Sequence, residues 1–168
     1  SREEAETIQR EKGYAMKEDA GRGWRRVVPS PLPRRIVEIG QVRDLWDKTI
    51  VVTCGGGGVP VIETAQGRLE GVAAVIDKDF AAELLAEQVD ADVLMILTEV
   101  EKVAINWGKP DQKDLSRMSL AEASRYVEEG HFAPGSMLPK VQAAMKFVRS
   151  DPGKKAVITS LDLSLIHI

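Results

Sequence analysis

The chain has 168 residues, of which 43% are hydrophobic and 29% charged, with a net charge of −3. This is the composition of a globular protein, and its near balance of charge gives no case for nucleic-acid binding. No apolar run approaches the roughly 18 residues of a membrane span, and the acidic, polar start is not a signal peptide. The single cysteine, Cys54, cannot form an internal disulfide, which fits a reducing, cytoplasmic compartment.

The first 34 residues are polar and mixed in charge. Residues 2–12 are compatible with a short solvated helix. Three prolines between residues 29 and 33 then favour an extended path, because proline fixes φ and has no amide donor. We therefore place the start of regular structure at Arg35.

The segment that follows Arg35 predicts one short helix and one strand. Val42, Leu45 and Trp46 have i, i+3, i+4 spacing, which is typical of an amphipathic helix. Residues 49–54, TIVVTC, form a β-branched run of strand length. Such a run predicts a strand that is buried on both faces.

Three further helices are expected in the second half of the chain. They are predicted over residues 80–89, over residues 120–129 and from Pro139 onward. Asp79 is the expected N-cap of the first of them. Ser119 and Glu122 have capping-box spacing at the start of the second.

Two apolar strands alternate with these helices: residues 92–98, DVLMILT, and residues 154–160, KKAVITS. The alternation predicts βαβ units and an α/β fold with a mostly parallel sheet covered on both sides. Ligands of such sheets bind beyond the carboxyl ends of the strands. Here those ends lead into a glycine run, into the segment after Thr98 and into the segment after Ser160.

The glycine run has two interpretations, and the residues alone favour neither. Glycine costs more backbone entropy on folding than any other residue, so four in a row need a reason. They form either a slack connector or a loop whose bare amides approach an anion. No P-loop or dinucleotide-binding pattern accompanies them. The four are Gly55, Gly56, Gly57 and Gly58.

Two lysines stand at predicted helix starts. Lys78 lies between two aspartates, and Lys140 lies in a first turn, where the helix dipole disfavours a cation. Each is a candidate to offset the negative charge of a phosphoryl group. The alternatives are an ordinary polar helix start for Lys78 and a solvated surface lysine for Lys140.

Three other residues are weaker candidates. His131 is more typical of a loop hydrogen bonder than of a catalyst, and no second histidine or cysteine nearby suggests a metal site. Cys54 has no evident base partner, so a buried structural thiol is expected rather than a nucleophile. Trp107 is suited either to stack on a base or to pack in its loop.

Five stretches resemble the carbamate kinases of the amino acid kinase family, in the order in which that family has them. They are DAGRGWRRVVPSP, CGGGGVPVI, VIDKDFAAELLAEQVDAD, LMILTEVEKVAINWGKP and EEGHFAPGSMLPKVQAA. The likeness runs from about Asp19 to Ser160. No one of the motifs discussed above would have identified the family alone.

The resemblance implies a three-layer αβα sandwich on an open, mostly parallel sheet. The implied reaction is reversible phosphoryl transfer between ATP and carbamate, giving ADP and carbamoyl phosphate, with Mg²⁺ on the nucleotide. In fermenting bacteria it usually runs toward ATP, as the last step of arginine breakdown. The family is typically cytoplasmic and homodimeric, and neither nucleic acid nor a membrane is an expected partner.

Residue roles follow from the motifs that match. Lys78 resembles the lysine that contacts the transferring phosphoryl group, and Asp79 the acid that orients the catalytic lysines. Lys140 resembles the lysine near the terminal phosphates of the nucleotide. The glycine run resembles part of the cradle for carbamate. The resemblance implies no protein-held metal, and its nucleotide-binding residues are Thr98, Val100, Lys109, Gly135 and Met137.

The sequence departs from the family in three places. The family's N-terminal portion, with its opening strand, its own glycine-rich phosphate loop and much of the acceptor lobe, has no counterpart here. Leu138 stands where carbamate kinases often have glycine, and the ending LDLSLIHI does not resemble the family's. Residues 1–34 are the expected remnant of a protruding lid-like subdomain, and residues 35–168 the nucleotide-binding part. We therefore expect an incomplete sheet, and a chain that is poorly stable and inactive by itself.

Two other functions stay open. One is a different enzyme of the amino acid kinase family, which phosphorylates another carboxylate or carbamate. The segments HFAPGSM and INWGKP argue against it, because they resemble the carbamate branch. The other is an inactive fragment that binds nucleotide without turnover.

Overall fold

The structure, a computed structural model, describes residues 1–19 and 21–164. The chain forms two units. One comprises Ser1–Pro31 with Val59–Ile76, and the other comprises Leu32–Gly58 with the chain from Asp77 onward. The predicted division at residue 34 did not include the return of residues 59–76 to the first unit. The end of the segment LDLSLIHI, residues 165–168, lies outside the described residues.

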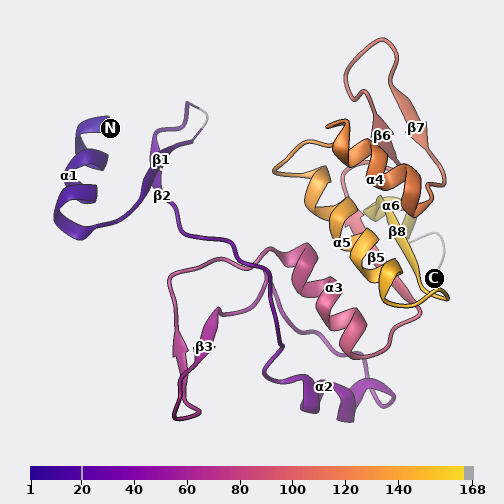
Figure 1. The fold of residues 1–168 in the computed structure, drawn as a ribbon, viewed down its shortest axis with the longest axis horizontal. Coiled ribbons are helices and arrows are strands. Elements are labelled where there is room, and N and C mark those ends of the chain that lie inside the picture. The colour runs from indigo at the N-terminus through magenta and orange to yellow at the C-terminus, as the bar shows by residue number, and fades with distance from the viewer. Residues whose placement is uncertain (20, 165–168) are drawn as a thin grey trace. The chain divides into compact units, whose positions relative to one another are not determined.

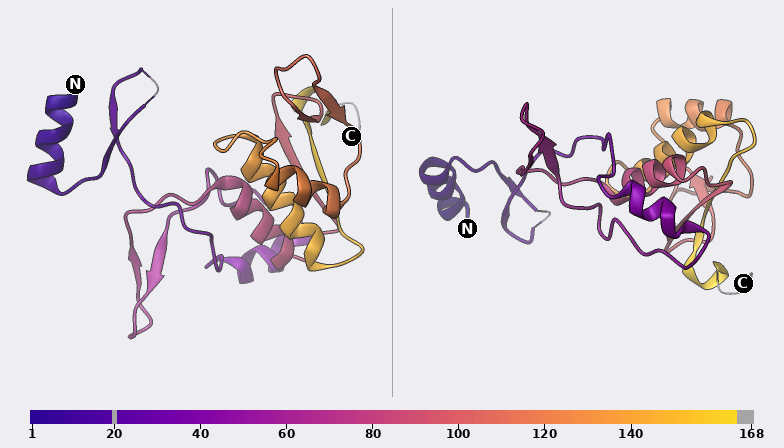
Figure 2. Two further views of the ribbon diagram at one scale, coloured as in Figure 1. Left: turned by 45° about the horizontal axis from the view of Figure 1, so that its top comes forward. Right: turned by 90° about the horizontal axis from the view of Figure 1, so that it is seen from below.

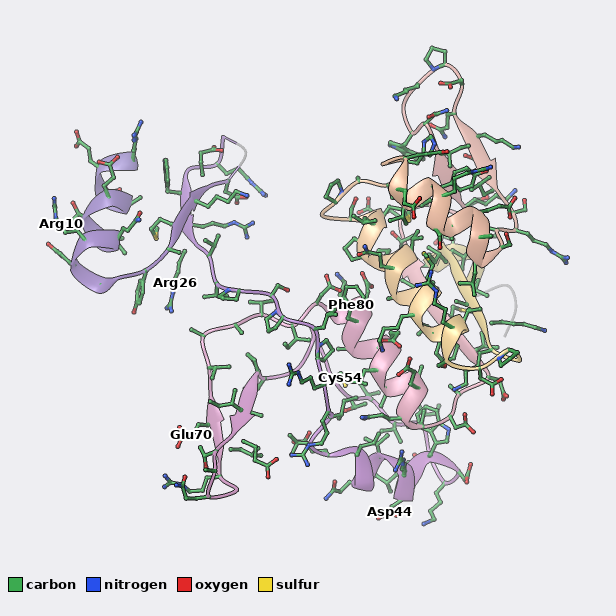
Figure 3. The ribbon with its side chains drawn as sticks, in the orientation of Figure 1. Arg10, Arg26, Asp44, Cys54, Glu70 and Phe80 are labelled. Atoms are coloured by element: carbon green, nitrogen blue, oxygen red, sulfur yellow. The ribbon has the colours of Figure 1, made fainter. Side chains whose placement is uncertain are left out.

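The first unit consists of a helix and two hairpins. Helix α1 (Arg2–Lys12) is held by a capping box between Ser1 and Glu4, which confirms the helix predicted over residues 2–12. Strands β1 (Met16–Glu18) and β2 (Trp24–Arg26) pair antiparallel, as do β3 (Val61–Glu63) and β4 (Leu69–Gly71). The guanidinium of Arg26, labelled in Figure 3, lies 3.7 Å from the ring centre of Tyr14.

The second unit holds the rest of the regular structure (Figure 1). Its helices are α2 (Ile39–Trp46), α3 (Lys78–Gln88), α4 (Leu120–Glu128), α5 (Met137–Ser150) and the short α6 (Leu161–Ser164). Its strands are β5 (Val93–Thr98), β6 (Val103–Ile105), β7 (Lys113–Leu115) and β8 (Lys155–Ser160). These bounds confirm the predicted helices at 42–46, 80–89 and 120–129, the one that contains Pro139, and the strands at 92–98 and 154–160. No helix in the described part of the chain is long and apolar enough to span a membrane.

Strands β5 and β8 are parallel neighbours, in a register that pairs Val93 with Lys155 and Thr98 with Ser160. This pairing confirms the predicted parallel sheet. Both strands therefore end at the same edge, where Thr98 and Ser160 lie side by side. The views in Figure 2 show α3 and α5 next to each other on one face of these strands.

The core of this unit lies between the strands and the two helices. Leu94 and Ile96 of β5 pack with Ala86 of α3 and with Ala143 and Phe147 of α5. The opposite face of β5 is half exposed, and the described residues do not supply the second cover that the sequence predicts.

Replacing Phe147 by alanine should destabilise this core by about 3–5 kcal/mol, because it removes a ring that is 0% exposed and leaves a cavity. Urea unfolding followed by circular dichroism measures the loss. Val148→Ala is the control, since Val148 only borders the cluster and should cost far less. A loss below about 1 kcal/mol for Phe147→Ala would contradict the packing described here.

The strand predicted over residues 49–54 was wrong. Ile50 and Val52 are each 92% exposed, and no described strand pairs with this segment. β-branched residues favour a strand only where neighbouring strands supply hydrogen bonds and packing. The apolar run alone therefore does not fix a strand in this chain.

Candidate active site

Helices α3 and α5 bring an acid and a lysine together across 61 residues of sequence. The Nζ atom of Lys140 donates to both carboxylate oxygens of Asp79, at 3.1 and 3.0 Å. The two side chains are 11% and 8% exposed. Lys140 is therefore not the solvated surface lysine that the sequence left open, but a buried cation held at the start of α5.

The start of α3 leaves Asp79 free for this pairing. Asp77, not Asp79, is the N-cap, because the Asp77 carboxylate accepts from the backbone N–H of Asp79 at 2.8 Å. The prediction of Asp79 as the cap was therefore wrong by two residues. Lys78 is the first residue of the helix, and it is exposed beside the buried pair.

The glycine run forms a tight turn in which the N–H of Gly57 donates to the carbonyl of Cys54 at 2.8 Å. Gly55, Gly57 and Gly58 have φ values of 43°, 128° and 86°. Glycine adopts these values without the strain that a side chain brings. Cys54 has φ of 62° and is partly buried, directly before the run (Figure 3).

A cavity of about 530 Å³ lies beyond the carboxyl end of β5. The hairpin of β6 and β7 and the segment between α4 and α5 complete its lining. None of the four glycines of the run lines it. The predicted nucleotide-binding residue Gly135 lies between the lining residues Pro134 and Ser136. Four other residues predicted to bind nucleotide do line it. The four are Thr98, Val100, Lys109 and Met137.

Further residues of this cavity were not assigned a binding role from the sequence, although Trp107 and His131 were weaker candidates. They are Glu99, Lys102, Ala104, Asn106, Trp107, Glu129, Gly130, His131, Phe132, Ala133, Pro134 and Ser136. All of them flank the predicted ones within residues 98–109 or 129–137. Their position in the two segments that carry the predicted residues is the signal that could have identified them.

The hairpin tip beside the cavity is held by its own side chains. Asn106 has φ of 54°, and its Nδ2 donates to Asp111 at 2.7 Å. The N–H of Gly108 donates to Oε1 of Gln112 at 2.9 Å. These bonds fix the backbone that carries Trp107, whose side chain is 62% exposed.

Asn106→Ala should loosen this tip by about 1–3 kcal/mol, because alanine loses the bond to Asp111 and tolerates the left-handed conformation less well. Hydrogen exchange should then become faster at the tip, while exchange in α5 stays as in the unchanged chain. Asn106→Gly keeps the conformational freedom and loses only the bond, so its effect should be smaller. Equal exchange in all three chains would contradict this role.

His131 lies on the other side of the same cavity. Its Nε2 lies 3.0 Å from Oε2 of Glu129, and its ring meets the edge of Tyr126 at a centroid distance of 5.5 Å. His131 is thus a loop hydrogen bonder, as the sequence favoured. Within the described residues, no group of three histidine, cysteine or acidic side chains is placed to hold a metal.

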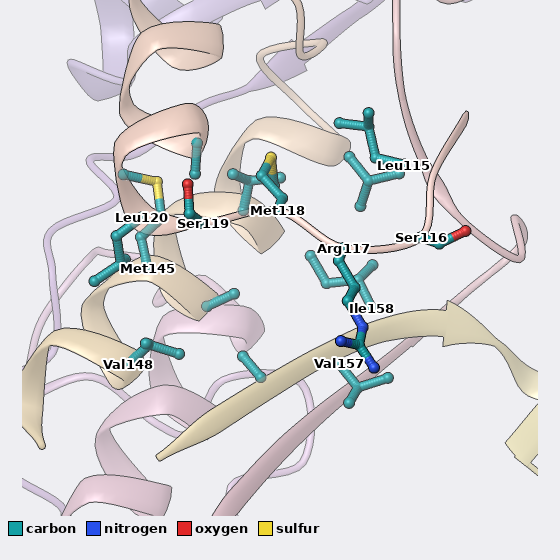
Figure 4. Close-up of a pocket in the computed structure, with 15 residues that line it drawn as sticks. Leu115, Ser116, Arg117, Met118, Ser119, Leu120, Met145, Val148, Val157 and Ile158 are labelled. Carbon is teal, nitrogen blue, oxygen red and sulfur yellow. The ribbon is translucent and has the colours of Figure 1, made fainter. Parts of the chain in front are cut away.

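A second, smaller cavity of about 240 Å³ lies between α4, α5 and β8 (Figure 4). Its lining is mostly aliphatic, with Met145, Val148 and Ile158 among the residues, and Arg117 reaches over Val157. None of the predicted site residues lines it. The cavity at the end of β5 is therefore the better candidate for a polar ligand.

A buried carboxyl lies further along the interface of the two helices. Glu83 of α3 is 1% exposed, and both of its oxygens accept from Nζ of Lys146, at 2.8 and 2.7 Å. Burial raises the pKa of Glu83 to about 7, the hydrogen bond to Glu87 adds to the rise, and Lys146 opposes it. The sequence analysis did not identify this residue.

Comparison with known proteins identifies the family. Residues 5–160 match the sequence model of the Amino acid kinase family. The chain therefore belongs to the amino acid kinase family.

Among its relatives, the carbamate kinase of Clostridium perfringens is 59% identical over 162 residues, which are 96% of this chain and 51% of that protein. The carbamate kinase-like protein YqeA of Escherichia coli is 56% identical over 160 residues, 95% of this chain and 51% of that protein. The chain thus spans about half the length of the curated relatives it matches.

Solved structures agree with this assignment. A Giardia lamblia carbamate kinase bound to AMP-PNP superposes with a TM-score of 0.88 at 44% identity, over 99% of this chain and 52% of that one. An Aeropyrum pernix protein superposes with a TM-score of 0.89 at 49% identity, over 98% and 53%. This likeness confirms the predicted fold class, an α/β fold of the amino acid kinase type with an open, mostly parallel sheet.

Proposed function

We propose that this chain carries the nucleotide-binding and phosphoryl-transfer residues of a carbamate kinase. The reaction is reversible transfer of a phosphoryl group between ATP and carbamate, with carbamoyl phosphate and ADP as the other pair. The observation that carries the proposal is the buried pair of Lys140 and Asp79 beside Lys78, at the starts of two helices. The identity of 59% to the Clostridium perfringens carbamate kinase supports the choice of carbamate.

The proposed mechanism depends on positive charge held in position. Phosphoryl transfer needs positioning and electrostatic stabilisation more than covalent chemistry. Lys140, fixed by Asp79, would contact the terminal phosphates of the nucleotide, and Lys78 would contact the phosphoryl group in transfer. Because Asp79 already neutralises Lys140 in the free chain, a bound phosphate would compete with it for the same ammonium protons.

The cavity at the end of β5 is the proposed site of the nucleotide. Its polar groups, which include Thr98, Lys102 and Lys109, suit the ribose and phosphates, and Trp107 offers a face for the base. The AMP-PNP complex of the Giardia relative supports the use of a nucleotide. The glycine run is proposed as one wall of the carbamate site, because no side chain shields its backbone amides from an anion.

Mg²⁺ is proposed to arrive on the nucleotide. Magnesium usually keeps several waters and binds through substrate phosphates and only one or two carboxylates. Asp79, the buried acid of the site, is already paired with Lys140. The residues present thus fit a metal carried by ATP or ADP, where it would offset phosphate charge.

The wider setting is proposed from the resemblance. It comprises a homodimer in the complete protein, a cytoplasmic location and a role in arginine breakdown. The single cysteine and its lack of an internal disulfide fit the location.

The test is ATP formation from carbamoyl phosphate and Mg-ADP. Because the relatives are about twice as long, two preparations are compared: this chain alone, and a hybrid chain in which the first half of the Clostridium perfringens enzyme precedes it. We expect turnover by the hybrid and little by the chain alone. Acetyl phosphate in place of carbamoyl phosphate should give far less ATP. A hybrid that prefers another acyl phosphate would instead favour a different enzyme of the family.

A nucleotide-binding role without turnover is the second candidate. It is favoured by the fact that all lining residues of the cavity come from residues 98–137 of this chain. Calorimetric titration of the chain with Mg-ADP distinguishes the two. Binding by the chain, together with an inactive hybrid, would support this second role.

A further inference from the structure

Helices α3 and α5 are joined by two ion-pair layers, and only the first belongs to the proposed site. Asp79 pairs with Lys140 near the helix starts, and Glu83, four residues further along α3, pairs with Lys146 of α5. The pairs come in the same order on both helices, so the helices are parallel, as Figure 1 shows. Lys140 and Lys146 are thus carried by the same helix.

The pair of Glu83 and Lys146 costs more free energy than apolar packing would at the same place. Removing a carboxylate from water costs several kcal/mol, and well-packed apolar residues in place of a buried ion pair are often neutral or stabilising. The surrounding interface is apolar, since Ala86, Ala143 and Phe147 pack nearby. Stability alone therefore does not account for the acid at this position.

The geometry of the pair supplies another reason. Both oxygens of Glu83 accept from one ammonium at 2.7–2.8 Å, and Oε1 of Glu87 lies 3.3 Å from the same Nζ. Lys146 is 46% exposed, so it reaches from the solvent side to an acid that is 1% exposed. Apolar side chains tolerate sliding along a helix, whereas a charge-assisted bond to a fixed acceptor sets one register.

We propose that Glu83, held by Lys146, is a positioning residue that sets the register of α5 on α3 and thereby the place of Lys140 against the nucleotide phosphates. This inference rests on the proposed function. Glu83 is not among the lining residues of the cavity proposed for the nucleotide. Its effect passes through α5, whose first turn carries Lys140.

The charge of Glu83 should make the positioning of Lys140 depend on pH. The charged groups that face it are Glu87 on its own helix and Lys146 on α5, while Lys154, before β8, acts on Glu87. Because the pKa of Glu83 is raised to about 7 from 4.5, its stabilising contribution is complete below pH 4.5 and is lost as the pH rises through about 7. Above pH 7 the carboxylate is charged and its bond to Lys146 is strongest. Stability and positioning thus have opposite pH dependence at this residue.

The experiment uses the chain itself and two ligands. Calorimetric titration with Mg-AMP-PNP reports the phosphate contacts of Lys140, and titration with adenosine reports the cavity alone. Glu83→Met should weaken AMP-PNP binding about tenfold, because Lys140 then loses one charge-assisted hydrogen bond to the phosphates. Adenosine binding should stay unchanged. Glu83→Gln should be intermediate. Glu128→Gln, an exposed acid of α4, is the control and should change neither ligand.

A pH series adds a readout that a merely structural role would not move. AMP-PNP affinity of the unchanged chain should rise through pH 7 relative to that of Glu83→Gln. The titration of the nucleotide itself is common to both chains and drops out of this comparison.

Three results would overturn the inference. They are unchanged AMP-PNP affinity in Glu83→Met, equal weakening of both ligands, or identical pH profiles in Glu83→Gln and the unchanged chain. If Glu83→Met does not fold, Glu83→Gln at pH 8 replaces it, because the unchanged chain then holds the charged carboxylate and the amide has nearly the same size. If the unchanged chain binds AMP-PNP no more tightly than adenosine, the proposed function itself fails, and this inference fails with it.

Discussion

Lys78→Ala should lower turnover of the hybrid chain by about 10²–10³-fold, with Mg-AMP-PNP affinity and unfolding temperature nearly unchanged. Lys78 is exposed at the first residue of α3, so its removal leaves no cavity and no buried charge. A lysine that meets the phosphoryl group only during transfer affects kcat rather than ground-state binding. The measurement is the steady-state rate of ATP formation at saturating Mg-ADP and carbamoyl phosphate.

Lys155→Ala is the matched control for this loss, because Lys155 is an exposed lysine at the start of β8. It should leave the rate within about twofold, since surface substitutions away from special features usually change stability by under 0.5 kcal/mol. A Lys78→Ala hybrid that turns over like the unchanged hybrid would remove Lys78 from the mechanism. An equal loss in both variants would show that charge in general, and not this lysine, is responsible.

Asp79→Asn should cost about 3–5 kcal/mol of stability as well as most of the turnover. The substitution leaves the ammonium of Lys140 buried, at 11% exposed, without its carboxylate. Thermal unfolding and the rate of ATP formation are measured on the same preparation. The stability loss should be far larger than that of Lys78→Ala, because Lys78 is exposed.

The double variant Asp79→Leu with Lys140→Met separates the two effects. Apolar residues of similar size in place of a buried ion pair are often neutral or stabilising, so the unfolding temperature should recover. Turnover should not recover, because no cation then stands at the start of α5. Recovery of both the unfolding temperature and the turnover would show that the pair is structural only. An unfolding temperature that stays low would contradict the description of Asp79 and Lys140 as partners of each other.

The elements that sequence alone predicted are those whose signals are local. Ser119 and Glu122 form the expected capping box, with the serine oxygen accepting from the N–H of Glu122 at 3.3 Å. Residues 92–98 and 154–160, each an apolar run of strand length, form the predicted strands, which pair in parallel. Neither prediction needed knowledge of distant contacts.

The errors have a common physical origin in contacts between distant segments. Among the described residues, no strand pairs with residues 49–54, and no local pattern reports that. Asp77 and Asp79 are both suited to cap a helix, and only Lys140, 61 residues away from Asp79, determines which of them is free. Glu83 was overlooked because a glutamate beside an apolar stripe ordinarily marks the solvent side of a helix.

The candidate site was predicted in the same uneven way. The roles of Lys78, Asp79 and Lys140 were predicted from the resemblance of their motifs to the family. Residue types alone were also compatible with a polar helix start for Lys78 and a solvated surface lysine for Lys140. The structure then brings Asp79 and Lys140 into contact. Nothing in the sequence links Trp107 to His131, because their place on one cavity depends on how the β6–β7 hairpin and the segment before α5 approach each other.

The most direct test of the account is the rate of ATP formation from carbamoyl phosphate and Mg-ADP by the hybrid chain and by its Lys140→Met variant. The account predicts clear turnover by the hybrid, a strong preference for carbamoyl phosphate over acetyl phosphate, and loss of most of that rate in the variant. A folded hybrid that forms no ATP, or a Lys140→Met hybrid that forms it at an undiminished rate, would contradict the central claim.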